Sequence, residues 1–95
     1  MRDKVVNAIQ RRLSLLGIFK HIYLFGSVLD VNKSPNDIDI LLIYDVYIDE
    51  VRQKANHMKK LLEEEFELPV DFTLLSVNEE KEVGFLSRIH WLCIK

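Results

Sequence analysis

The chain is short of the residues that mark several protein classes. It has a single cysteine, Cys93, among its 95 residues, so no internal disulfide can form, and a lone thiol is typical of a reducing compartment. Only 3 Gly and 2 Pro are present, which excludes collagen-like and low-complexity chains. No apolar run approaches the roughly 18 residues of a membrane-spanning helix. The first residues also lack the apolar stretch of a signal peptide. We therefore expect a cytoplasmic protein without membrane contact.

An excess of positive charge is also missing. The formal net charge is -2, with 13 Lys and Arg against 15 Asp and Glu. Extended nucleic-acid binding requires a basic surface that neutralises many phosphates, so we do not expect it here. A single nucleotide is not excluded, because it needs only a local site.

What remains is the composition of a soluble globular protein, with 48% hydrophobic and 29% charged residues. This length predicts one domain over residues 1–95. The spacing of apolar residues predicts helices over 3–16, 47–66 and 78–92, and strands over 20–25, 37–44 and 69–74. The fold class is therefore α/β (α+β), with a small mixed sheet of about three strands flanked by helices. The strand over 37–44 should be central, because both of its faces become apolar after Asp39.

Two carboxylates share one face of this strand. Asp37 and Asp39 are two residues apart, so their side chains point the same way at a Cα separation of roughly 6–7 Å. Like charges at that distance repel unless a cation lies between them, and Mg²⁺ binds such carboxylates together with phosphate oxygens. Asp71 begins the next strand between Val70 and Phe72, and it joins the pair if the two strands are neighbours. The alternative is a solvated strand end whose acids bind nothing.

Gly26 and Ser27 follow the strand over 20–25. Glycine allows backbone to approach a phosphate closely, and the Ser hydroxyl and the following N–H groups can donate to its oxygens. Phosphate donors beside carboxylates that hold a metal are the parts required for phosphoryl or nucleotidyl transfer. Taken alone, Gly26-Ser27 would be an ordinary turn.

The segments FGSVLDVNKSPNDIDILLIYD and LPVDFTLL together resemble the minimal nucleotidyltransferases of the DNA polymerase β-like superfamily. The family signature is a hydrophobic residue and Gly-Ser, then a spacer, then Asp-hydrophobic-Asp-hydrophobic. Residues 25–27 and 37–40 match it, and Asp71 matches the family's third acid, which lies between hydrophobic residues. The resemblance covers about residues 1–92 and implies the nucleotidyltransferase fold.

The resemblance implies a metal-dependent transfer of a nucleoside monophosphate, with AMP expected, from a nucleoside triphosphate to a hydroxyl. Asp37 and Asp39 would hold two Mg²⁺ ions, and Asp71 would bind the catalytic metal and help to deprotonate the acceptor. Gly26 and Ser27 would contact the β- and γ-phosphates.

The segment after Gly-Ser departs from the family pattern. Many members carry Arg-Ala-Arg-Gly there, whereas residues 28–31 of this chain are Val-Leu-Asp-Val. The change removes positive charge, so the resemblance implies weaker triphosphate binding, for which Lys33 would partly compensate.

A separate partner would supply the acceptor, because we expect a single domain. The resemblance suggests a helical HEPN toxin, with this chain acting as the antitoxin of a toxin–antitoxin pair by adenylylating a tyrosine. An acceptor of low molecular weight is the second option, and a homo-oligomer is one of the assemblies that the sequence permits. The alternative function is a catalytically weak or inactive module of the same fold that neutralises a partner by docking.

Overall fold

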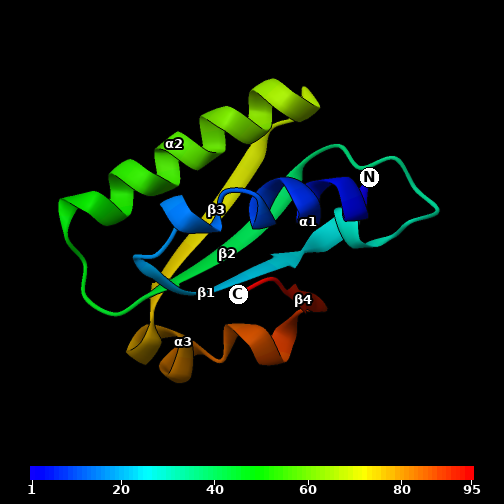
Figure 1. The fold of residues 1–95 in the computed structure, drawn as a ribbon. Helices are drawn as coiled ribbons and strands as arrows, with labels where there is room; N and C mark the ends of the chain where they lie inside the picture. Colours follow the sequence, from blue (N-terminus) through cyan, green and yellow to red (C-terminus); the bar gives the residue numbers. More distant parts are fainter.

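The computed structural model describes residues 1–95 (Figure 1). In chain order, the elements are α1 (Arg2–Gln10), η1 (Leu13–Leu15), β1 (Phe19–Phe25), η2 (Gly26–Leu29), β2 (Ile38–Tyr44), α2 (Asp49–Phe66), β3 (Val70–Ser76), α3 (Val77–Val83), η3 (Phe85–Arg88) and β4 (Trp91–Cys93), where η denotes a 3₁₀ helix. Helices α1 and α2 cover one face of the sheet, and α3 lies across the other (Figure 1). The α+β class with a mixed sheet between helices is confirmed.

The sheet has four strands in the order β3-β2-β1-β4. Strands β2 and β3 are parallel, whereas β1 is antiparallel to both β2 and β4. The predicted central position of β2 is confirmed, and the sheet has one strand more than expected. The parallel connection through α2 places the beginnings of β2 and β3 at the same edge.

The main core lies between the sheet and the helices α1 and α2. On β2, the side chains of Ile38, Ile40 and Leu42 face the helices and are fully buried. Helix α2 contributes its buried stripe through Val51, Ala55, Met58 and Leu62. The alternation of period two in the strand and the three-to-four spacing in the helix bring these apolar side chains together. No helix in the structure is both long and apolar enough to cross a membrane.

The first helix is shorter than the sequence predicts. Helix α1 ends at Gln10 instead of residue 16, and η1 follows it. The Arg12 side chain donates to the Ala8 carbonyl (2.7 Å), which satisfies a free acceptor in the last helical turn. The 3₁₀ turn still buries Leu16, which explains why the apolar spacing continues beyond the end of the helix.

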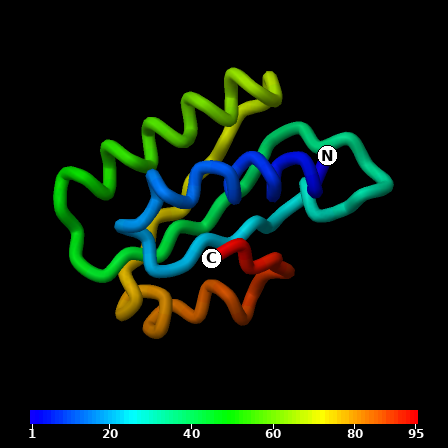
Figure 2. The backbone as a smooth tube through the Cα atoms, viewed as in Figure 1, coloured from blue at the N-terminus to red at the C-terminus, as the bar shows by residue number.

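The tail contains a different structure from the predicted helix over 78–92. Ser76 caps α3 in a capping box with Glu79, but the helix ends at Gly84, whose φ is 63°. After η3, residues Trp91–Cys93 pair with β1 as the strand β4. The chain path passes across the sheet from α3 and returns beside β1 (Figure 2).

Candidate active site

The three predicted acids lie together at one edge of the sheet. In the parallel pairing of β2 with β3, Asp39 is directly opposite Asp71, and Asp37 immediately precedes β2. Each of the three offers a carboxylate oxygen, and these oxygens lie within 4.8 Å of one another. The acids lie on the sheet face opposite α1 and α2, which we call the open face because α3 covers only part of it. The convergence that the sequence predicted, conditional on β2 and β3 being neighbours, is therefore observed.

The charge of this cluster is not compensated within the chain. Burial raises the pKa of Asp39 above 3.8, and the neighbouring charges of Asp37 and Asp71 raise it further. The ion pairs of the structure involve other acids. Three carboxylates this close fit a hard divalent cation such as Mg²⁺, which prefers oxygen ligands and would remove the repulsion between them.

The backbone of Gly26 contacts the carboxylate of Asp39. Gly26 has a φ of 81°, a left-handed conformation that residues with a Cβ rarely adopt. A Cβ at this position would overlap the Asp39 carboxylate. The glycine that the sequence suggested for approach to a phosphate therefore also makes room for an acid of the site. Ser27 follows it at the start of η2 and is exposed.

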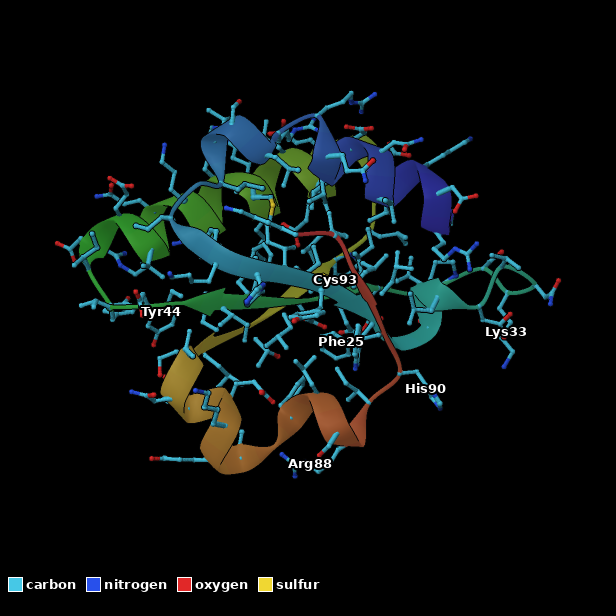
Figure 3. All side chains as sticks on the ribbon, turned by 60° about the horizontal axis from the view of Figure 1, so that its bottom comes forward. Phe25, Lys33, Tyr44, Arg88, His90 and Cys93 are labelled. Atoms are coloured by element: carbon cyan, nitrogen blue, oxygen red, sulfur yellow. The ribbon has the colours of Figure 1, made fainter.

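The segment after Gly-Ser packs inward or pairs with itself. Val28 is 1% exposed and belongs to the core, so this position does not present a side chain to a ligand. Asp30 accepts a hydrogen bond from the backbone N–H of Asn32 (2.9 Å) and lies 3.8 Å from the Lys33 ammonium. Figure 3 shows Lys33 on an outer loop, away from Phe25 at the end of β1. The structure does not bring Lys33 into the acid cluster.

The open face also carries aromatic side chains that no sequence motif connects with the acids. Phe25 is directly opposite Asp39, and Trp91 is directly opposite Phe25. The sequence places Trp91 in the predicted helix over 78–92, away from the sheet. The β-branched and aromatic residues Ile89, Trp91 and Ile94, which are enriched in strands, were the signal that could have revealed β4.

The acids lie on an open surface. None of the four hollows of the structure is lined by Asp37, Asp39 or Asp71. One hollow of about 210 Å³ lies further along the open face, where His21 and Ile43 contribute to its wall. Access to the acids from solvent therefore does not pass through a narrow pocket.

A comparison with known families matches residues 7–89 to the family described as "Polymerase beta, Nucleotidyltransferase". The chain belongs to this nucleotidyltransferase family. The fold of this nucleotidyltransferase domain is similar to the crystal structure of a candidate nucleotidyltransferase from Sulfolobus solfataricus, with a TM-score of 0.56. The two chains are 17% identical, and the match covers 98% of this chain and 78% of the other. At this identity the likeness shows the fold alone. A comparison with curated proteins finds no match.

Proposed function

We propose that the chain transfers a nucleoside monophosphate, with AMP the expected group, from a nucleoside triphosphate to a hydroxyl group. The observation that carries this proposal is the convergence of Asp37, Asp39 and Asp71 beside Gly26. The family match supports the same class of reaction. We further propose that residues 1–95 act as a single domain.

We assign two roles to the acids, metal binding and acceptance of a proton. Asp37 and Asp39 would hold two Mg²⁺ ions, since both lie at the beginning of β2 and Asp39 lies next to Gly26. Asp71 contributes to the metal site and accepts the proton of the acceptor hydroxyl, because it is the most exposed of the three acids. When bound, Mg²⁺ would neutralise these carboxylates and stabilise charge on the phosphate oxygens.

The reaction replaces the phosphoanhydride bond between the α- and β-phosphates with a phosphoester bond to the acceptor. The acceptor oxygen forms a bond to the α-phosphorus, its proton passes to the Asp71 carboxylate, and the bond to the β-phosphate oxygen breaks with release of pyrophosphate. In this proposal, backbone N–H groups and the Ser27 hydroxyl at the start of η2 orient the β- and γ-phosphates, and the exposure of Gly26 and Ser27 supports this role. The phosphate contact of Lys33 stays a prediction. Its exposed ammonium group lies near Asp30, on a loop away from the acid cluster.

The acceptor belongs to a separate molecule in our proposal. The open position of the acids suits a hydroxyl carried by another protein, such as a tyrosine of a helical HEPN-type toxin, more than a buried ligand of low molecular weight. A small helical protein encoded beside this chain would support the antitoxin role, and modification of its tyrosine in a reaction with labelled ATP would test it.

Calorimetry with Mg²⁺ and each nucleoside triphosphate tests the central proposal. We expect binding by the wild-type chain in Mg²⁺, no binding in EDTA, and no binding by Asp37→Asn/Asp39→Asn. Asp45→Asn is the matched control, because Asp45 is an exposed acid at the far end of β2 whose ion pair is with Lys20. The enzyme proposal fails if the wild-type chain shows no metal-dependent nucleotide binding.

A docking module without catalysis is the second candidate function. Two observations favour it: the segment after Gly-Ser presents no basic group at Val28, and apolar side chains are exposed before α2 at Val46, Tyr47 and Ile48. A docking module would neutralise its partner equally well after Asp37→Asn/Asp39→Asn. An enzyme would lose that ability with the same double substitution.

A further inference from the structure

Trp91 is the only tryptophan of the chain, and its ring is exposed but held in place. The residue is 47% exposed at the start of β4. Its indole N–H donates to the Leu86 carbonyl (3.1 Å), and its ring packs edge to face against Tyr23, with the ring centres 5.1 Å apart. Aromatic rings in folded proteins usually bury most of their surface. An exposed ring with a fixed orientation is a preformed surface for a flat ligand.

The strand register places this ring beside the acids. Residues directly opposite one another in a sheet share a face, and Trp91, Phe25, Asp39 and Asp71 form one such row across the four strands. Trp91 and Asp39 are two strand spacings apart, which is roughly 9–10 Å. This separation is comparable with the length of a nucleotide from its α-phosphate to its base.

An apolar surface separates the two ends of this row. Phe25 lies between Trp91 and Asp39, and Phe85 of η3 packs against it edge to face, with the ring centres 5.4 Å apart. This contact fixes the Phe25 ring, and no charged residue stands in the row between Asp39 and Trp91. The row therefore offers acids for metal and phosphate at one end and an aromatic ring at the other.

From this arrangement we infer that Trp91 stacks on the base of the nucleotide whose phosphates lie at the acids. The inference rests on the proposed function and adds a base-binding residue to it. The ring loses little conformational freedom on binding, because its hydrogen bond and its contact with Tyr23 already fix it. Since every base has an aromatic face, stacking on Trp91 alone does not select one base over another.

The intrinsic fluorescence of Trp91 provides a direct test, because the chain contains no other tryptophan. The wild-type chain is titrated in Mg²⁺ with a non-hydrolysable ATP analogue, with the corresponding GTP analogue and with inorganic tripolyphosphate. We expect both nucleotides to quench the fluorescence, with the same midpoint as in calorimetry. Tripolyphosphate, which has no base, should bind in calorimetry without quenching.

Substitutions separate stacking from a structural role. Trp91→Leu should weaken nucleotide binding roughly 5- to 150-fold, as expected for the loss of one aromatic stacking partner, and leave tripolyphosphate binding unchanged. Trp91→Phe should recover most of the affinity. Tyr47→Leu, at a 51% exposed aromatic residue before α2, is the matched control and should change neither affinity. Circular dichroism confirms that each variant is folded.

The outcomes distinguish this inference from the proposed function. If the wild-type chain binds no nucleotide in calorimetry, both are wrong. If it binds nucleotide but Trp91 fluorescence does not change, or if folded Trp91→Leu binds nucleotide as tightly as the wild type, stacking is wrong and the proposed function stands. Weaker binding of a partner protein by Trp91→Leu, with nucleotide affinity intact, would also overturn stacking and would assign Trp91 to a protein interface.

Discussion

The two faces of β2 have different tasks. On the face toward α1 and α2, Ile38, Ile40 and Leu42 are fully buried and belong to the hydrophobic core. On the open face, the same strand begins with acids and becomes apolar only at Leu41 and Ile43, which are also buried. Because successive side chains of a strand point to opposite faces, neighbouring residues of β2 can serve the core and the acid cluster in turn.

Because the two faces of β2 differ in this way, a small domain can carry three neighbouring acids. The main core lies on the face toward α1 and α2, so most of the free energy gained by apolar burial does not depend on the acids. The acids in turn lie at the beginning of β2 and β3, where water reaches them. Stability and chemistry should therefore respond to different substitutions, and the following experiments test that separation.

The largest expected effect on stability is that of Ile40→Ala. The Ile40 side chain is completely buried against the helices, and truncation of such a residue costs about 2–5 kcal/mol in the free energy of unfolding. Urea denaturation measures this loss. Val46→Ala, at a 70% exposed side chain, should change stability by less than about 0.5 kcal/mol. Because Ile40 points away from Asp39, nucleotide affinity under fully folding conditions should not change, and a large loss of affinity would contradict the separation of the two faces.

Gly26→Ala should have the next largest effect, and it should affect both stability and the site. The left-handed backbone of Gly26 costs a residue with a Cβ about 1–2 kcal/mol, and that Cβ would also displace the Asp39 carboxylate. Thermal unfolding should show lower stability, and addition of Mg²⁺ should no longer raise the unfolding temperature.

Gly17→Ala is the matched control for Gly26→Ala. A Cβ at Gly17 would meet no atom within 4 Å, so this substitution should be neutral or stabilise by up to about 1 kcal/mol. Equal effects of the two substitutions would show that the contact between Gly26 and Asp39 has no part in shaping the site.

The sequence predicted most of the main sheet because the physical signal there is local. The alternation in β2 and the three-to-four spacing in α2 depend on neighbouring residues, and both elements appear within about two residues of the predicted bounds. The convergence of Asp37, Asp39 and Asp71 required only the further assumption that β2 and β3 are adjacent, which the parallel pairing satisfies.

The structure of the tail and the contact of Gly26 with Asp39 could not be predicted from neighbouring residues alone. Strand β4 has three residues, and what defines it is the pairing of Trp91 with Phe25, a residue distant in sequence. The spacing of Val83, Leu86 and Ile89 suits a helix, but Gly84 ends α3 and a 3₁₀ helix with a similar period follows. The contact of Gly26 with Asp39 depends on how β1 and β2 pair, which no motif spacing specifies.

The smallest expected effect has the opposite sign and comes from Asp39→Asn in metal-free protein. Because the pKa of Asp39 in the folded chain lies above 3.8, the folded state binds this proton more tightly than the unfolded state does. The free energy of unfolding therefore falls as the pH rises from 3.8 through the raised pKa, and it stays lower above that pKa. Asn lacks this titration, so the variant should be the more stable protein at neutral pH. The gain should be less than about 1 kcal/mol, because water screens a partly exposed charge.

Thermal unfolding in EDTA and in Mg²⁺ across this pH range measures both parts of the effect. In EDTA, the advantage of Asp39→Asn should disappear well below pH 3.8, where the wild-type carboxyl group is protonated in both states. In Mg²⁺ at neutral pH the order should reverse, because a cation that binds only the folded wild-type chain stabilises it. Asp45→Asn should show neither behaviour. If Asp39→Asn is less stable than the wild type in EDTA at neutral pH, the acid contributes to folding as well as to the site, and the two faces of β2 are not independent.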